Sequence, residues 1–140
     1  MSLPETNQIL RAYLASGAGS TAALVALVGA RIYCPRLPEN AVLPALGFFT
    51  RGGTVNPHIP DLPAPSVQFD CWGRTPIEAR SVYNALYDAL QGIQHIAVVI
   101  GATTYYIKSA IEDVQGQDLV DTEIQNYFRV LTFFQIMISE

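Results

Sequence analysis

Residues 66–90 read SVQFDCWGRTPIEARSVYNALYDAL, and this stretch decides the fold. Its first part alternates, with the apolar residues Val67, Phe69 and Cys71 on one face, which is the pattern of a half-buried β-strand. The pattern then becomes helical, because TPIE at 75–78 is a capping box with proline at the first helical position. The stretch therefore predicts a strand, a tight turn and a helix of about four turns in direct succession.

Two shorter helices are predicted on the N-terminal side. One begins with the capping residues Ser2 and Glu5 and stops at Gly17, and the other covers residues 20–28. A short strand candidate follows at 31–33, before a stretch that contains prolines. A further strand is predicted from Leu43 to Arg51, where Gly52-Gly53 is expected to end it.

The C-terminal side is predicted to be all strand. Residues 96–100 and 103–113 form two strand candidates, residues 115–118 read as a turn or loop, and 124–138 is a long strand. At about 3.3 Å per residue the last strand would span roughly 50 Å. A domain of this size has a radius of gyration of about 14 Å. The last hairpin should therefore bend, or reach onto a neighbouring molecule.

Helices and strands do not alternate regularly along the chain. This order predicts an α+β fold, in which a mainly antiparallel sheet carries two to three helices on one face and ends in a long C-terminal β-hairpin. The 140 residues, at 15.3 kDa, correspond to a single domain over 1–140.

The composition excludes several classes of protein. Half of the residues are apolar and 14% are charged, which excludes a disordered chain. The net charge of −4 excludes a highly basic nucleic-acid binder. The longest apolar stretches, 22–28 and 96–100, are far shorter than the roughly 20 residues of a membrane helix. With no secretory signal in view, a soluble intracellular protein without membrane partners is expected.

No catalytic, cofactor-binding or metal site is predicted. His58 and His95 have no acidic or thiol partner at ligand spacing, and Cys71 alternates onto the buried face of its strand. Asp70 falls on the opposite, wetter face and is expected at the surface or at an interface rim. The alternative is a small-ligand-binding domain or enzyme, in which Cys71, Asp70 and His95 would meet in a pocket.

Five acidic residues crowd the predicted turn between the last two strands, and Lys108 is the only basic residue nearby in the sequence. The five are Glu112, Asp113, Asp118, Asp121 and Glu123. They predict a solvated hairpin tip. The alternative is a negative surface that lines a channel, through which DNA passes without sticking because phosphate binding needs Lys and Arg.

Residues 53–65 form a proline-rich loop that contains two PxxP matches. The simplest interpretation is an exposed loop without a partner. The alternative, more specific interpretation is that the loop contacts a partner protein. The candidate contact residues in and beside it are Arg51, Asn56, His58, Ile59, Asp61 and Leu62.

An ordered series of motifs runs through residues 22–92. LVALVGARIYCPRLP at 24–38 leads to a proline-entered strand, LPALGFF at 43–49, then to the alternating VQFDCW at 67–72 and the helix entry TPIEA at 75–79. In this order and spacing the chain resembles the tail completion family of tailed bacteriophages.

The resemblance implies a structural role without catalysis or cofactor. Tail terminators of this kind form a ring, typically a hexamer, at the head-proximal end of the tail tube. The ring stops tube growth, contacts the tail tube protein and the head connector, and lets DNA cross its lumen. A location in the virion tail or neck, after assembly in the host cytoplasm, follows from the resemblance. A head-completion or connector adaptor protein is the alternative within the virion.

Overall fold

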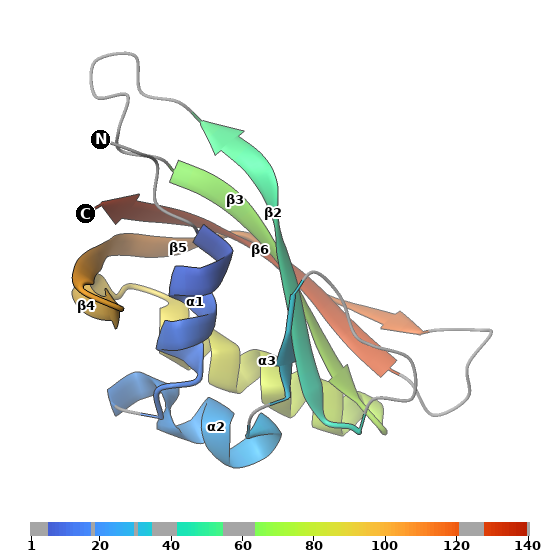
Figure 1. The fold of residues 1–140 in the computed structure, drawn as a ribbon. Helices are drawn as coiled ribbons and strands as arrows, with labels where there is room; N and C mark the ends of the chain where they lie inside the picture. Colours follow the sequence, from blue (N-terminus) through green and yellow to red (C-terminus); the bar gives the residue numbers. More distant parts are fainter. Residues whose placement is uncertain are drawn as a thin grey trace.

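The computed structural model describes residues 6–17, 19–29, 31–34, 42–54, 64–120 and 128–139. Within them, six strands form one curled sheet in the order β1-β2-β3-β6-β5-β4, and the helices cover one of its faces (Figure 1). Among the described strands, only β1 and β2 pair in parallel. The α+β prediction is confirmed.

The elements are α1 (Thr6–Leu14), the 3-10 helix η1 (Gly19–Thr21), α2 (Ala22–Val28), β1 (Ile32–Tyr33), β2 (Ala45–Thr54), β3 (Ala64–Gly73), α3 (Pro76–Leu90), β4 (Gln94–Ile100), β5 (Thr103–Val120) and β6 (Phe128–Ser139).

The strand–turn–helix stretch is confirmed. Val67, Phe69 and Cys71 are fully buried on the helix-covered face of β3. At the start of α3, the backbone N–H of Glu78 donates to the hydroxyl of Thr75 at 3.1 Å, as a capping box requires. The carboxylate of Glu78 departs from the motif, because it accepts the N–H of Arg74 at 3.0 Å.

The core lies between the sheet and the helices. The ring of Phe69 stacks on that of Phe48 from β2, with 5.8 Å between centroids, and meets that of Phe134 from β6 edge-on at 5.7 Å. Helix α3 buries Leu86 and Leu90 against this layer. These apolar faces fix the sheet register, since a slip by one residue would turn them outward.

The predicted turn at 115–118 is wrong, because these residues belong to β5, where Gln117 and Asp118 pair with Leu131 and Val130 of β6. The pairing shifts register around Val114, so that the segment enters the sheet through β-bulges. Gly116 is needed there for close approach: a Cβ on it would lie 2.8 Å from the ring of Tyr83. The glycine admits the helix against the strand and does not end the strand.

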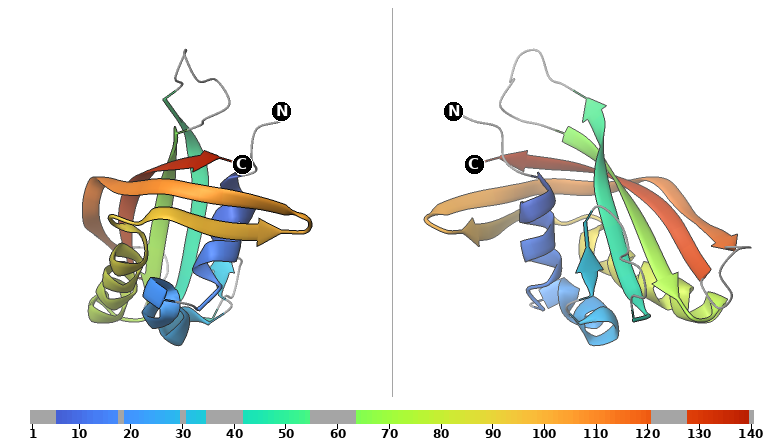
Figure 2. Two further views of the ribbon diagram at one scale, coloured as in Figure 1. Left: turned by 90° about the vertical axis from the view of Figure 1, so that its left-hand side faces the viewer. Right: turned by 45° about the vertical axis from the view of Figure 1, so that its right-hand side comes forward.

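The prediction that the last hairpin bends is confirmed. Figure 2 shows β5 curving across the molecule, with β4 beside its first part and β6 beside the rest. A third register shift lies between Ile107 and Ser109. Bulges increase the local twist and bend of a strand, so they account for the curvature of an 18-residue strand.

Strand β2 also differs from its predicted end. It continues through Gly52 and Gly53 to Thr54, with a register shift between Thr50 and Gly53. Glycine in a strand often marks a bulge, and that is its role here.

Candidate functional site

The described members of the predicted acidic cluster, Glu112, Asp113 and Asp118, lie in different environments. Glu112 is half-buried in the middle of β5, on the side of α3. Its Oε2 accepts the hydroxyl of Tyr83 at 2.6 Å and lies 2.9 Å from the hydroxyl of Thr132 on β6. Its backbone N–H donates to the side chain of Gln91 at 2.7 Å. Glu112 therefore joins α3, β5 and β6 and is not at a hairpin tip.

The other two described acids of this group, Asp113 and Asp118, have separate environments. Asp118 forms an ion pair of 3.0 Å with Arg80 of α3. Asp113 is exposed, at the register shift between Glu112 and Val114. Asp121 and Glu123 lie outside the described residues.

Of the predicted partner-contact residues, the structure describes Arg51. This side chain is exposed on β2, where its guanidinium lies 5.2 Å from the ring centroid of Phe133 and donates to Gln68 at 3.3 Å. The remaining candidates, Asn56, His58, Ile59, Asp61 and Leu62, lie outside the described residues.

Asp70 is buried, contrary to the prediction of a wetter position. Its residue exposure is 7%, because the guanidinium of Arg129 lies over the neighbouring ring of Trp72 and reaches within 3.7 Å of Oδ1. Oδ1 has no hydrogen-bond partner. Burial raises the pKa of Asp70, while the charge of Arg129 and a hydrogen bond from Gln68 partly oppose the rise. Sequence alternation alone gave no signal for this cluster, since it depends on the pairing of β3 with β6.

The structure does not bring Cys71, Asp70 and His95 together. Cys71 is buried on the helix-covered side, and burial raises the pKa of its thiol well above the usual value. His95 is exposed on β4, which two strands separate from β3. Among the described residues, no group of three His, Cys, Asp or Glu side chains is placed to hold a metal ion.

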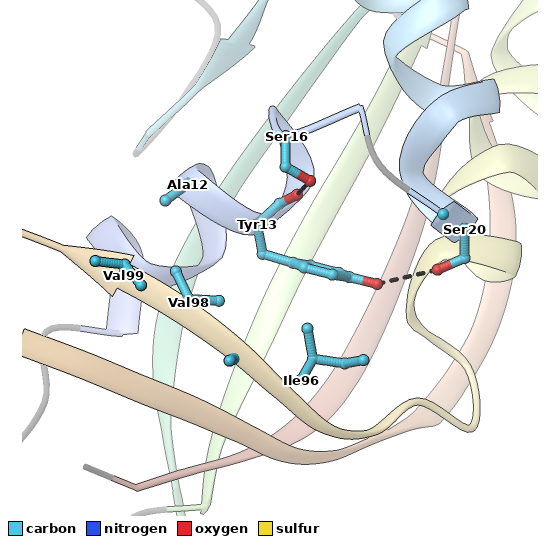
Figure 3. A pocket seen from close by; sticks show the side chains of 9 residues that line it. Ala12, Tyr13, Ser16, Ser20, Ile96, Val98 and Val99 are labelled. Atoms are coloured by element: carbon cyan, nitrogen blue, oxygen red, sulfur yellow. Dashed lines mark hydrogen bonds between the residues drawn. The ribbon is translucent and has the colours of Figure 1, made fainter.

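A groove of about 460 Å³ lies between α1, η1 and the edge strand β4 (Figure 3). Tyr13 lies across it, and its hydroxyl is bonded to the carbonyl of Ala89 at 2.6 Å. The Ser16 hydroxyl donates to the carbonyl of Tyr13 at 2.7 Å. These hydroxyls already have partners, so the groove offers mainly apolar contacts. Its lining residues are Ala12, Tyr13, Ser16, Gly19, Ser20 and residues 96–99.

No single helix of the described chain is long and apolar enough to cross a membrane. The segments Thr6–Leu14 and Gly19–Val28, bent by 77° at their junction, satisfy that criterion only when taken as a pair, by length and composition.

Comparison with known proteins identifies a similar fold. No family model matches the chain, and no curated protein matches its sequence. Among solved structures, a chain in "Virion of native gene transfer agent (GTA) particle" superposes with a TM-score of 0.61 and 14% sequence identity. The match covers 97% of this chain and 98% of that one. At this identity the similarity shows a shared fold.

Proposed function

We propose that this chain is a structural protein of a phage-like virion, and more narrowly a tail terminator. One observation carries the proposal: nearly the whole chain shares its fold with nearly the whole of a chain from a gene transfer agent virion. The match leaves little of either chain unpaired, so the shared fold extends over nearly the whole of both chains and is not limited to a motif. The motif series in residues 22–92 supports the narrower role.

In this proposal the protein acts by shape and performs no reaction. Copies associate head-to-tail, and such heterologous contacts close into a ring when the rotation between copies permits. We expect a hexamer that contacts the tail tube protein on one side and the head connector on the other. It would lie in the neck of the virion, after assembly in the host cytoplasm.

DNA would cross the lumen of this ring without sequence-specific contact and without a cofactor. Of the described acids in the predicted cluster, Asp113 is exposed and is available to a negative lumen wall. Glu112 and Asp118 are engaged within the chain.

Loss of the gene tests the proposed role. Without a terminator, tails should be over-long or unfinished, whereas loss of a head adaptor should leave free tails of normal length. In light scattering, the purified chain mixed with tube protein should assemble toward about 92 kDa, six copies of the 15.3 kDa chain. Tails of normal length in the mutant, together with a chain that stays monomeric beside its tube protein, would contradict the proposal.

A further inference from the structure

Strands β2, β3, β6 and β5 have a second face, which the described helices leave uncovered (Figures 1 and 2). Gln68, Asp70 and Trp72 of β3 point to this side, because the alternate residues of the strand are buried under the helices. Directly paired residues of antiparallel strands point to the same side of a sheet. The pairing of β3 with β2 and β6, and of β6 with β5, therefore gives the rest of this surface, which we call the outer face.

The outer face is rich in apolar and aromatic side chains. On β5, Ile111 is 57% exposed and Val114 is 39% exposed. The apolar members of the face are Phe49, Trp72, Ile111, Val114, Leu131 and Phe133. Exposed apolar surface of this kind marks a site of protein contact, and aromatic residues together with arginine are enriched in such contacts.

Two arginines lie over the rings of this face. The guanidinium of Arg51 is 5.2 Å from the ring centroid of Phe133, and that of Arg129 is 5.4 Å from the ring of Trp72. The 3.7 Å between Arg129 and Oδ1 of Asp70 is too long for a hydrogen bond, and no ion pair within the described chain involves Arg51. Both guanidiniums therefore have N–H donors left for an acidic group of another chain.

Helix α3 has an exposed stripe that complements the outer face. Ile77, Asn84 and Asp88 follow one another at spacings of seven and four residues, so they lie on one side of the helix. Ile77 is 81% exposed, the highest value among the large apolar side chains of the described chain. Asp88 is exposed and takes part in none of the ion pairs within the same part of the chain. The stripe thus offers an apolar group at one end and a carboxylate at the other.

The stripe and the outer face also agree in length. Ile77 and Asp88 are eleven residues apart, which is about 16 Å of helix. On the outer face, Val114 pairs with Phe133, which is four residues from Arg129 along β6, or about 13 Å of strand. The two lengths agree within the reach of an arginine side chain. Because α3 packs on the opposite face of its own sheet, the helix that meets the outer face must come from a second copy.

We propose that the outer face binds helix α3 of a second copy, with Ile77 against Val114 and Asp88 beside Arg129. The contact would give the sheet a helix on each face, which is a common layered arrangement. It joins two different surfaces, so it is heterologous and can repeat around a ring. The proposal rests on the proposed function, since it names the copy-to-copy contact of that ring.

Thiol crosslinking tests the contact directly. In a Cys34→Ser background, which removes the exposed native thiol, Ile77→Cys protein is mixed with Val114→Cys protein and mildly oxidised. The mixture should give disulfide-linked heterodimers about tenfold faster than Val99→Cys mixed with Val114→Cys, because the contact raises the local thiol concentration. Val99 is 66% exposed on β4, outside the stripe, and serves as the matched control. Equal rates in the two mixtures would overturn the proposal.

A double-mutant cycle tests the ion pair. In the crosslinking mixture, Asp88→Asn in the Ile77→Cys protein and Arg129→Gln in the Val114→Cys protein should each slow dimer formation, by roughly threefold. Together they should slow it no more than either does alone, because both remove the same interaction. Lys108→Gln in the Val114→Cys protein removes a positive charge from the β4–β5 hairpin and should leave the rate unchanged.

Melting temperatures of the variants establish that each one folds, and Asp88→Asn tests the pair without a change near Asp70. An unchanged rate with Asp88→Asn, or fully additive effects of the two substitutions, would count against the pairing of Asp88 with Arg129. Tube capping is scored separately. Capped tubes without preferential crosslinking would reject this contact and leave the proposed function standing, whereas crosslinking without capping would reject the terminator role and keep the contact.

Discussion

The hydroxyl of Tyr83 lies 2.6 Å from Oε2 of Glu112 and joins the middle of α3 to the bend of β5. The same hydroxyl oxygen accepts the backbone N–H of Gly116 at 3.2 Å. Burial first, and then the neighbouring carboxylate, raise the pKa of Tyr83, so the phenol remains a hydrogen-bond donor at neutral pH. Helix α3 therefore holds the curvature of the hairpin.

Tyr83→Phe should lower the free energy of unfolding by about 1–3 kcal/mol, because the half-buried Glu112 loses its shortest hydrogen bond. Chemical denaturation measures the change. Tyr87→Phe, on the exposed side of the same helix, is the control and should change stability by less than about 0.5 kcal/mol. Equal effects of the two substitutions would show that the Tyr83 hydroxyl contributes nothing specific.

Gly116→Ala should destabilise the fold by about 1–3 kcal/mol through overpacking, since the new Cβ meets the Tyr83 ring and the side chain of Val130. The exposed neighbour Gln115→Ala should be nearly neutral. If Gly116→Ala were as stable as the parent in thermal melts, the close approach of helix and strand would not explain the glycine.

Sequence patterns correctly predicted β3 and the start of α3, because both depend on residues that are close together in the chain. The alternation of Val67, Phe69 and Cys71 and the Thr75 cap required no knowledge of the rest of the chain. Gly116 was misread as a turn residue, because its reason is Tyr83, a ring 33 positions earlier. A glycine that ends a strand and one that admits a helix look alike in sequence.

The candidate site was less predictable than the fold. Alternation placed Asp70 outward correctly, but its burial comes from Arg129, which reaches it only through the pairing of β3 with β6. The edge position of β4 depends on strand order, which residue patterns do not contain. The five acids are close in sequence, yet the bulges of β5 give Glu112, Asp113 and Asp118 different environments.

Asp70→Asn should stabilise the protein at pH 7, because it removes a carboxylate whose ionised form is disfavoured by burial. The pKa of Asp70 is higher in the folded state than its ordinary value of 3.8. The contribution of the protonated carboxyl to folding stability is therefore fully present below pH 3.8 and is lost as the pH rises through the folded-state pKa. The advantage of Asn should therefore be largest at neutral pH and vanish in acid. Denaturation midpoints at several pH values measure it, and a less stable variant at pH 7 would show that the Arg129 ion pair dominates.

Thr75→Ala should cost about 0.5–2 kcal/mol, because the N–H of Glu78 loses its cap. Ser81→Ala, on an exposed turn of α3, is the comparison and should cost less. Thermal unfolding followed by the helical signal in circular dichroism measures the stability of both variants. An unchanged stability of Thr75→Ala would show that the Thr75 cap does not stabilise the helix.

Electron microscopy of tube protein polymerised with and without this chain tests most directly the proposal that the chain ends tail tubes. Tubes grown with the chain should be shorter and should carry a ring at one end. Tubes of unchanged length with bare ends, at saturating concentrations of a folded chain, would contradict it.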